Sequence, residues 1–135
     1  MKTKIVMTRA ALSFSAMLIA STAFASADGL LSDYQNAGAG PFSAEAGAAA
    51  WQKKHSADSQ PTERSCSLCH GTDLSQPGKH AKTGKAIKPM STAANPERLS
   101  DPKKTEKWFR RNCRWTLGRE CTAQEKGDFV RFFNQ

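Results

Sequence analysis

Apolar residues gather into a few short runs along the chain, and long polar stretches rich in Gly, Pro and Lys separate these runs. After an apolar N-terminal stretch, Leu30, Leu31 and Tyr34 predict a short helix around residues 30–35. Gly38 and the Gly and Pro that follow it break this helix. The pattern therefore predicts helices of modest length joined by long loops.

A second helix is predicted over residues 44–54, where an alanine-rich sequence has high helix propensity and Ser43 can act as the N-cap. Gly47 lies four residues before Trp51, so the two residues share one face of this helix. The polar stretch from residue 56 to residue 65 is predicted to be a loop.

Two further helices are predicted in the C-terminal third. Asp101 followed by Pro102 is typical of a helix start, and this helix is expected to end near residues 112–113. Thr122 and Glu125 form a capping box that opens a last helix, whose broad apolar face carries three phenylalanines. With no convincing strand or internal repeat, the predicted fold class is all-α, with about four helices.

The stretch from residue 71 to residue 95 has almost no apolar periodicity apart from residues 87–90. It is predicted to be a long basic loop, and such loops in compact domains are usually functional. Its repeated lysines are Lys79, Lys82, Lys85 and Lys88.

The N-terminal segment has the layout of a secretory signal peptide. It begins with Lys2, Lys4 and Arg9, continues with an apolar run over residues 10–20, and ends in small residues. We expect residues 1–27 to be the signal peptide, cleaved after Ala25 or Ala27, and residues 28–135 to be the mature domain. An uncleaved anchor is the alternative, but the run is shorter than the ~20 apolar residues that span a bilayer. A periplasmic location without stable membrane insertion is expected.

The 135 residues suffice for one domain, and the formal net charge is +8. Hydrophobic residues make up 39% and charged residues 24%, which is an ordinary globular balance. Despite the basic charge, nucleic acid is not the expected partner, because the chain is predicted to be exported and its tryptophans lie in apolar contexts. The mature protein is expected to be a monomer.

Cys66, Cys69 and His70 form the C-x-x-C-H motif to which c-type haem is attached. Two thiols three residues apart lie on one side of a helical turn, where each can form a thioether with a vinyl group of haem. The next residue, His70, can then supply the proximal imidazole to the iron. One covalent haem c is the predicted cofactor.

Two other kinds of site use similar residues. A thioredoxin-type redox pair needs a βαβ context, which the chain lacks. A zinc site needs two more ligands, and Cys113 and Cys121 could supply them, but four free thiolates are not expected in an oxidising compartment. Haem attachment is therefore favoured, and Cys113 and Cys121 are expected to form a disulfide worth ~2–3 kcal/mol.

The sixth ligand of the iron decides the function. A His/Met pair makes an electron carrier, whereas an open or weakly held position lets the iron bind a gas. Met90 is the only Met outside the predicted signal peptide, and it lies in the long loop. Asn112 lies next to Cys113, and His55 and His80 are the other histidines, which we expect to be solvent-exposed.

Several segments together resemble the SHP family of oxygen-binding monohaem cytochromes c, which are relatives of class I cytochromes c. These segments are residues 106–113, 118–126, 83–89, 95–98 and 44–47. The class I fold implies that the first helix of the haem domain crosses the last at Gly47, and that Trp51 packs on the phenylalanines of the last helix. The domain is thus expected to be class I cytochrome c-like, with its helices around one covalent haem c.

The resemblance also implies a site. His70 and Asn112 would hold the iron, Cys113 and Cys121 would form the disulfide, and Asn112 would leave on reduction so that O₂ or NO can bind. A dihaem cytochrome c is implied as the electron donor. Lysines of residues 79–88, with Lys103, Lys104 and Lys107, are expected to surround the haem edge and attract an acidic partner.

The predicted function is an exported monohaem cytochrome that accepts an electron, releases Asn112 and binds a small ligand. Two alternatives remain at this point. In the first, Met90 is the ligand and the protein is a His/Met electron-transfer cytochrome. In the second, the protein is an enzyme that reduces or oxidises the bound diatomic.

Overall fold

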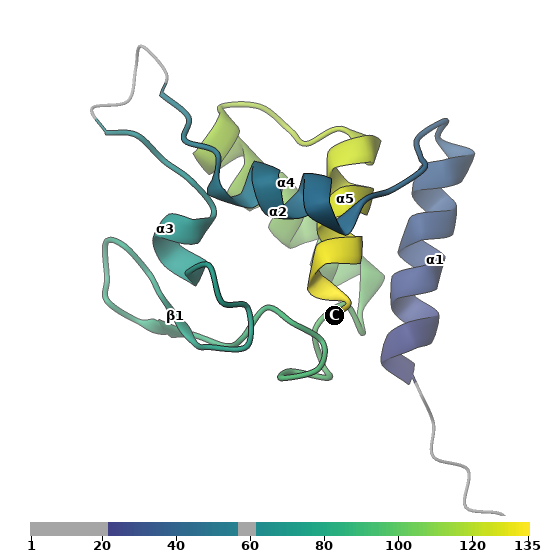
Figure 1. Cartoon of the computed structure of the whole chain (residues 1–135), viewed down its shortest axis with the longest axis horizontal. Helices are drawn as coiled ribbons and strands as arrows, with labels where there is room; N and C mark the ends of the chain where they lie inside the picture. The colour runs from purple at the N-terminus through teal and green to yellow at the C-terminus, as the bar shows by residue number, and fades with distance from the viewer. Residues whose placement is uncertain (1–21, 57–61) are drawn as a thin grey trace, which may run out of the picture.

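The computed structural model describes residues 22–56 and 62–135. These residues form five helices and one short pair of strands, so the described part is mostly helical, as predicted, with one helix more than expected. In Figure 1, α1 lies at one side and α3 with β1 at the other, and α2, α4 and α5 lie between them. The elements are α1 Thr22–Asn36, α2 Ala44–Gln52, α3 Ser67–His70, β1 Gly78–Lys79, β2 Ala86–Ile87, α4 Pro102–Leu117 and α5 Ala123–Phe133.

The predicted helix starts are confirmed by their caps. The side chain of Asp101 accepts a hydrogen bond from the backbone N–H of Lys104 at the start of α4. Thr122 and Glu125 form the complete capping box of α5. The predicted end of α4 is wrong, because the helix continues for a further turn until Gly118, whose φ of 75° ends it in the left-handed conformation.

The crossing of α2 and α5 is confirmed at Gly47. A Cβ atom on this residue would lie 2.3 Å from the backbone oxygen of Asp128, so no larger residue fits. One turn later, the Trp51 ring packs on α5 in edge-to-face geometry. The distances from its centroid to those of Phe129, Phe132 and Phe133 are 5.9, 6.1 and 5.2 Å.

α1 is longer than predicted, and it packs against α5 and α4. Ala27, Leu30, Leu31 and Tyr34 from this helix are buried in the core, and Ala27 has no exposed surface. The Tyr34 hydroxyl donates a hydrogen bond to Glu106 of α4. The helix therefore crosses the boundary predicted between residues 27 and 28, while residues 1–21 lie outside the described part.

The basic loop contains a small hairpin that the sequence did not predict. β1 and β2 pair antiparallel, with Gly78 opposite Ile87 and Lys79 opposite Ala86. Strands of two residues are too short to show the alternation by which strands are recognised in a sequence. This finding corrects the expectation that residues 71–95 form a loop without strands.

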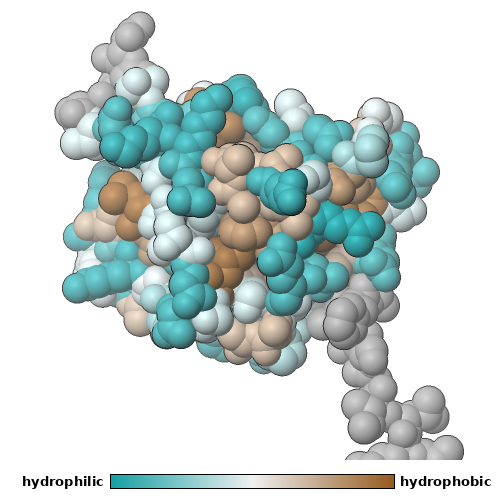
Figure 2. All heavy atoms as spheres, viewed as in Figure 1, coloured by the Kyte–Doolittle hydropathy of each residue, from teal (hydrophilic) through white to brown (hydrophobic). Residues whose placement is uncertain are grey.

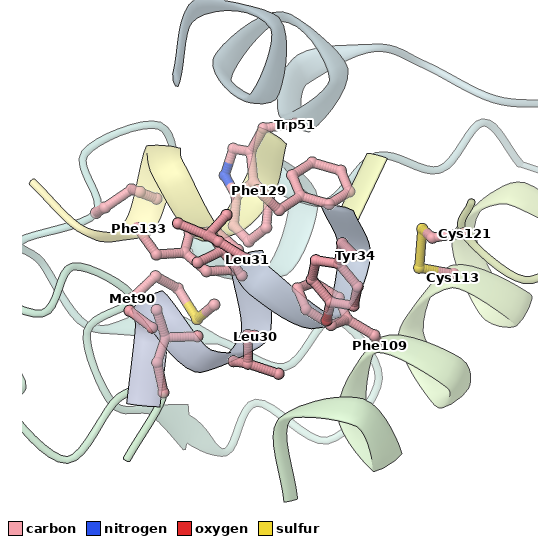
Figure 3. Packing of buried hydrophobic residues seen from close by; sticks show 14 residues of the cluster. Leu30, Leu31, Tyr34, Trp51, Met90, Phe109, Cys113, Cys121, Phe129 and Phe133 are labelled. Atoms are coloured by element: carbon pink, nitrogen blue, oxygen red, sulfur yellow. A yellow bond between two sulfur atoms is a disulfide. The ribbon is translucent and has the colours of Figure 1, made fainter. Parts of the chain in front are cut away.

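Buried apolar residues form one cluster that draws on α1, α2, α4, α5 and the loop that carries Met90 (Figure 3). In the middle of the face seen in Figure 2, apolar atoms also reach the surface between hydrophilic residues. Patches of this kind often mark ligand sites. Among the helices of residues 22–56 and 62–135, none is long and apolar enough to cross a membrane.

Candidate haem site

The haem motif forms a single helical turn, α3, with Cys66 immediately before it. Trp51 of α2 fixes this turn, because its indole N–H donates a 2.9 Å hydrogen bond to the carbonyl of Gly71. The Trp51 ring also lies 5.2 Å from the His70 ring, measured between centroids. The crossing of α2 and α5 thus positions the histidine of the motif.

Gly78 supports the motif through β1. A Cβ atom at this position would lie 2.4 Å from the carbonyl oxygen of Cys69 and 2.8 Å from the Cα of His70. Only a glycine allows the hairpin to approach so closely. Sequence reasoning missed this role, because a Gly after a Pro signals no more than a turn.

His70 is suited to bind a metal as a neutral imidazole. Burial, together with the positive charge of Arg98, lowers the pKa of His70 to about 4. Its Nδ1 atom is buried and has no hydrogen-bond partner among the described residues. At neutral pH the imidazole is therefore uncharged. No polar contact among the described residues accounts for the burial of its Nδ1 atom.

The two cysteines of the motif are not bonded to each other. Burial raises the pKa of the Cys66 thiol to about 11, although a hydrogen bond with Thr116 acts in the opposite direction. Reactive redox cysteines have a lowered pKa, so Cys66 does not resemble one. Two free thiols on one turn beside a neutral histidine fit the covalent attachment of haem c.

The zinc alternative is not supported by the geometry. Cys113 and Cys121 are joined by a disulfide (Figure 3), so neither thiolate is free to bind a metal. In residues 22–56 and 62–135, no group of three or more His, Cys, Asp and Glu side chains could hold a metal ion.

The segment that carries Met90 is fastened to the region of His70. The backbone N–H of Met90 donates to the carbonyl of Leu74, four residues after the motif. The carbonyl of the preceding residue, Pro89, accepts hydrogen bonds from Arg98, the arginine whose charge acts on His70. Met90 is only 8% exposed and belongs to the apolar cluster, so packing accounts for its burial.

Asn112 lies on α4, and its residue is exposed. It shares a helix face with Thr116 one turn later, and Thr116 lies close enough to Cys66 to oppose the rise in the pKa of that thiol. Arg64, two residues before Cys66, also contacts α4. It donates a 2.9 Å hydrogen bond to the carbonyl of Trp115, and its guanidinium lies 4.3 Å from the Trp115 ring centroid. These contacts tie the end of α4 that follows Asn112 to the segment before the haem motif.

The other two histidines are not part of this arrangement. His80 is exposed, as predicted, and its Nδ1 accepts hydrogen bonds from two backbone N–H groups of its own turn. His55 is half-buried rather than exposed, and its backbone pairs with that of Arg64 in an isolated bridge.

Sequence reasoning missed several residues that organise the site. Arg98 and Arg64 act through contacts between distant segments, which no local pattern reveals. Thr116 could have been noticed, because it lies four residues after Asn112 on the same helix face.

Comparison with known proteins places this arrangement in a family. Residues 37–133 match the family described as a domain of unknown function, DUF1924. The chain is 38% identical over 101 residues to the cytochrome c-type protein SHP of Cereibacter sphaeroides, covering 75% of this chain and 77% of that protein. It is also 34% identical over 70 residues to cytochrome c″ of Methylophilus methylotrophus, covering 52% of this chain and 49% of the relative.

Solved structures agree with these matches. Oxidised SHP, described as an oxygen-binding cytochrome c, superposes with a TM-score of 0.73 at 36% identity, covering 79% of this chain and 94% of that chain. Oxidised cytochrome c″ gives a TM-score of 0.71 at 28% identity, covering 81% and 93%. The predicted class I cytochrome c-like fold and the haem c cofactor are confirmed, and the chain belongs to the family of SHP-type cytochromes c.

Proposed function

We propose that this protein is an exported monohaem cytochrome c that accepts one electron and then binds O₂, NO or a similar small ligand. When bound, haem c supplies an iron centre that changes oxidation state and can take a diatomic ligand. Cys66 and Cys69 hold the cofactor through thioethers, and His70 is the proximal ligand. Asn112 occupies the opposite position in the oxidised protein and withdraws on reduction.

The observation that carries this proposal is the placement of Asn112. Its helix is tied to the segment before Cys66 by a hydrogen bond from Arg64, whereas the segment of Met90 is tied to the region of His70. The ligand opposite His70 must come from an element that does not pack behind the imidazole, and α4 meets this condition. The amide is exposed, which leaves it room to move.

The chemistry of the amide supports a ligand that leaves. A carboxamide is a neutral and hard donor, so it suits a ferric centre and competes poorly for a softer ferrous one. A solution structure of cytochrome c″ is described in terms of haem-ligand detachment, which supports the same kind of behaviour in this chain. Asn112 would thus act as a gate that opens when an electron arrives.

The surroundings proposed for this function are periplasmic. Residues 1–27 would direct export and be removed after Ala25 or Ala27, and Cys113 would join Cys121 in the oxidising compartment. An acidic redox partner, such as a dihaem cytochrome c, would dock on the exposed lysines near the haem edge. Lys88 contributes least to this surface, because it already pairs with Glu97 at 3.1 Å.

Two variants of the loaded protein test the ligand assignment. Asn112→Ala should strongly change the visible spectrum of the oxidised protein, whereas Met90→Leu, which keeps the apolar volume, should leave it nearly unchanged. Reduced wild-type protein should have a five-coordinate, high-spin spectrum and bind CO. If Met90→Leu changes the oxidised spectrum instead, and the reduced wild type does not bind CO, the protein is a His/Met electron carrier.

The enzyme alternative is tested separately. Steady consumption of O₂ or NO by the wild-type protein with an excess of reductant would indicate turnover. Binding of one equivalent of ligand without further consumption would indicate a binding protein.

A further inference from the structure

Trp108 is an exposed aromatic residue for which the fold gives no structural reason. It is 44% exposed, and the other large hydrophobic residue that is exposed in the described part is Leu68 of the haem motif. Its ring makes a cation–π contact with the Arg111 guanidinium, which lies 5.5 Å from the ring centroid. Its indole N–H has no hydrogen-bond partner among the described residues. An aromatic ring in such a position suggests a role in binding.

The geometry of α4 relates Trp108 to the proposed ligand site. Trp108, Asn112 and Thr116 follow one another at intervals of four residues, so they form one row along the helix. Each step along this row is about 6 Å. The end of α4 that carries Thr116 is tied to the segment before the haem motif, because Arg64 donates a 2.9 Å hydrogen bond to the carbonyl of Trp115. Asn112 lies one turn from that anchor, and Trp108 lies one turn beyond Asn112.

This row of residues extends past the position where the ligand would bind. If Asn112 holds the iron, Trp108 would lie one helical turn beyond it on the side away from Thr116, next to the position that a small ligand would take. There a large flat side chain can cover the space that Asn112 leaves. Arg111, one turn after Trp108 along the helix, holds the indole by a cation–π contact.

We infer that Trp108 is a specificity-determining residue that covers the small-ligand position beside Asn112 and controls how fast a diatomic ligand enters and leaves. This inference rests on the proposed function, because it needs a ligand position next to Asn112. A cover of this kind slows entry and exit together, so it changes the rates much more than the equilibrium affinity. It also limits the access of molecules larger than a diatomic.

The test uses CO as the probe and the reduced, haem-loaded protein. Trp108→Ala should raise both the association and the dissociation rate of CO by about tenfold, which corresponds to a barrier lower by about 1.4 kcal/mol. Trp108→Phe keeps most of the ring surface and should restore rates close to those of the wild type. The rates are measured by flash photolysis and by ligand replacement.

Arg110→Ala is the matched control. Arg110 is exposed like Trp108 and lies two residues after it on α4, so it projects about 200° away around the helix. Its removal should leave both CO rates unchanged. Unchanged far-ultraviolet circular dichroism and an unchanged oxidised spectrum would show that each variant is folded and keeps Asn112 in place.

The outcomes separate this inference from the proposed function. If wild-type protein binds CO and Trp108→Ala leaves both rates unchanged, the cover is overturned and the proposed function stands. A Trp108→Ala variant that alters only the rate of electron transfer from a partner would identify Trp108 as a docking residue, which also overturns it. If reduced wild-type protein binds no CO, the proposed function fails, and the cover fails with it.

Discussion

The residues around His70 and those around Asn112 differ in how firmly the fold holds them. His70 packs on Trp51, and its motif is fixed by a hydrogen bond from that indole and by the close approach of Gly78. Asn112 is exposed on α4, and no hydrogen bond holds its side chain among the described residues, although the next residue, Cys113, is bonded to Cys121. The difference suggests that the fold keeps the cofactor fixed and leaves movement to one amide side chain.

The largest expected effect of a single substitution is at Trp51. Trp51→Ala removes a side chain that is 4% exposed and that contacts three phenylalanines of α5, so we expect a loss of about 3–5 kcal/mol in the free energy of unfolding. Guanidinium unfolding of the haem-loaded protein measures it. Trp51→Phe should lose less, because a ring remains. A loss below 1 kcal/mol for the alanine variant would show that the His70 side is not the firmly held one.

The bond between Cys113 and Cys121 gives the next largest effect. It closes a short loop with a sequence separation of 8, so replacing both residues with Ser should reduce the stability by about 2–3 kcal/mol. Reduction of the wild-type protein with a thiol reagent is the control. It should reproduce the loss, because thioethers to haem resist such reagents. Equal stability of the protein with and without the disulfide would show that this bond does not stabilise the Asn112 side.

Glu125 tests the N-terminus of α5, the helix on which Trp51 packs beside His70. Its carboxylate accepts two hydrogen bonds from Arg119 and one from the backbone of Thr122. The bond from Arg119 is the main reason why the pKa of Glu125 falls from 4.5 to about 2, although burial opposes this shift. A lowered pKa stabilises the fold at pH values above 4.5, and this contribution is lost as the pH falls toward 2.

Glu125→Gln should therefore be less stable than the wild type by about 1 kcal/mol at neutral pH, the usual size of a capping contribution. The difference should shrink as the pH falls from 4.5 toward 2, as measured by urea unfolding at several pH values. Glu120→Gln is the control, because Glu120 pairs with Arg114 on the surface, outside the capping box. A difference that is constant with pH would contradict the assignment.

The sequence predicted the parts of the fold that local chemistry determines. The caps at Asp101 and Thr122 were found because a side chain and the N–H group three residues later suffice to form them. The crossing at Gly47 followed from the resemblance to class I cytochromes c. The length of α1 was not predictable in this way, because that helix is stabilised by burying Ala27 and its neighbours against distant elements.

The residues of the candidate site fall into the same two groups: those that a local pattern reveals and those that only the fold brings together. The motif from Cys66 to His70 is local, and its spacing alone indicates haem c. Arg98 and Gly78 act on His70 across long stretches of chain, so only the three-dimensional structure reveals them. The hairpin of β1 and β2 was missed because each strand has two residues, and a pattern of that length carries no signal.

The smallest expected change in stability is at Asn112, and it depends on the oxidation state. In the reduced protein, Asn112→Ala should change the unfolding free energy by less than about 0.5 kcal/mol, because the residue is an exposed surface residue when it is not bound to the iron. In the oxidised protein the wild type should be more stable than the variant, because its amide adds one coordination bond. Unfolding curves of both proteins in both states measure this difference. An equal loss in the two states would mean that Asn112 acts as a structural residue, and the contrast between the His70 side and the Asn112 side would then disappear.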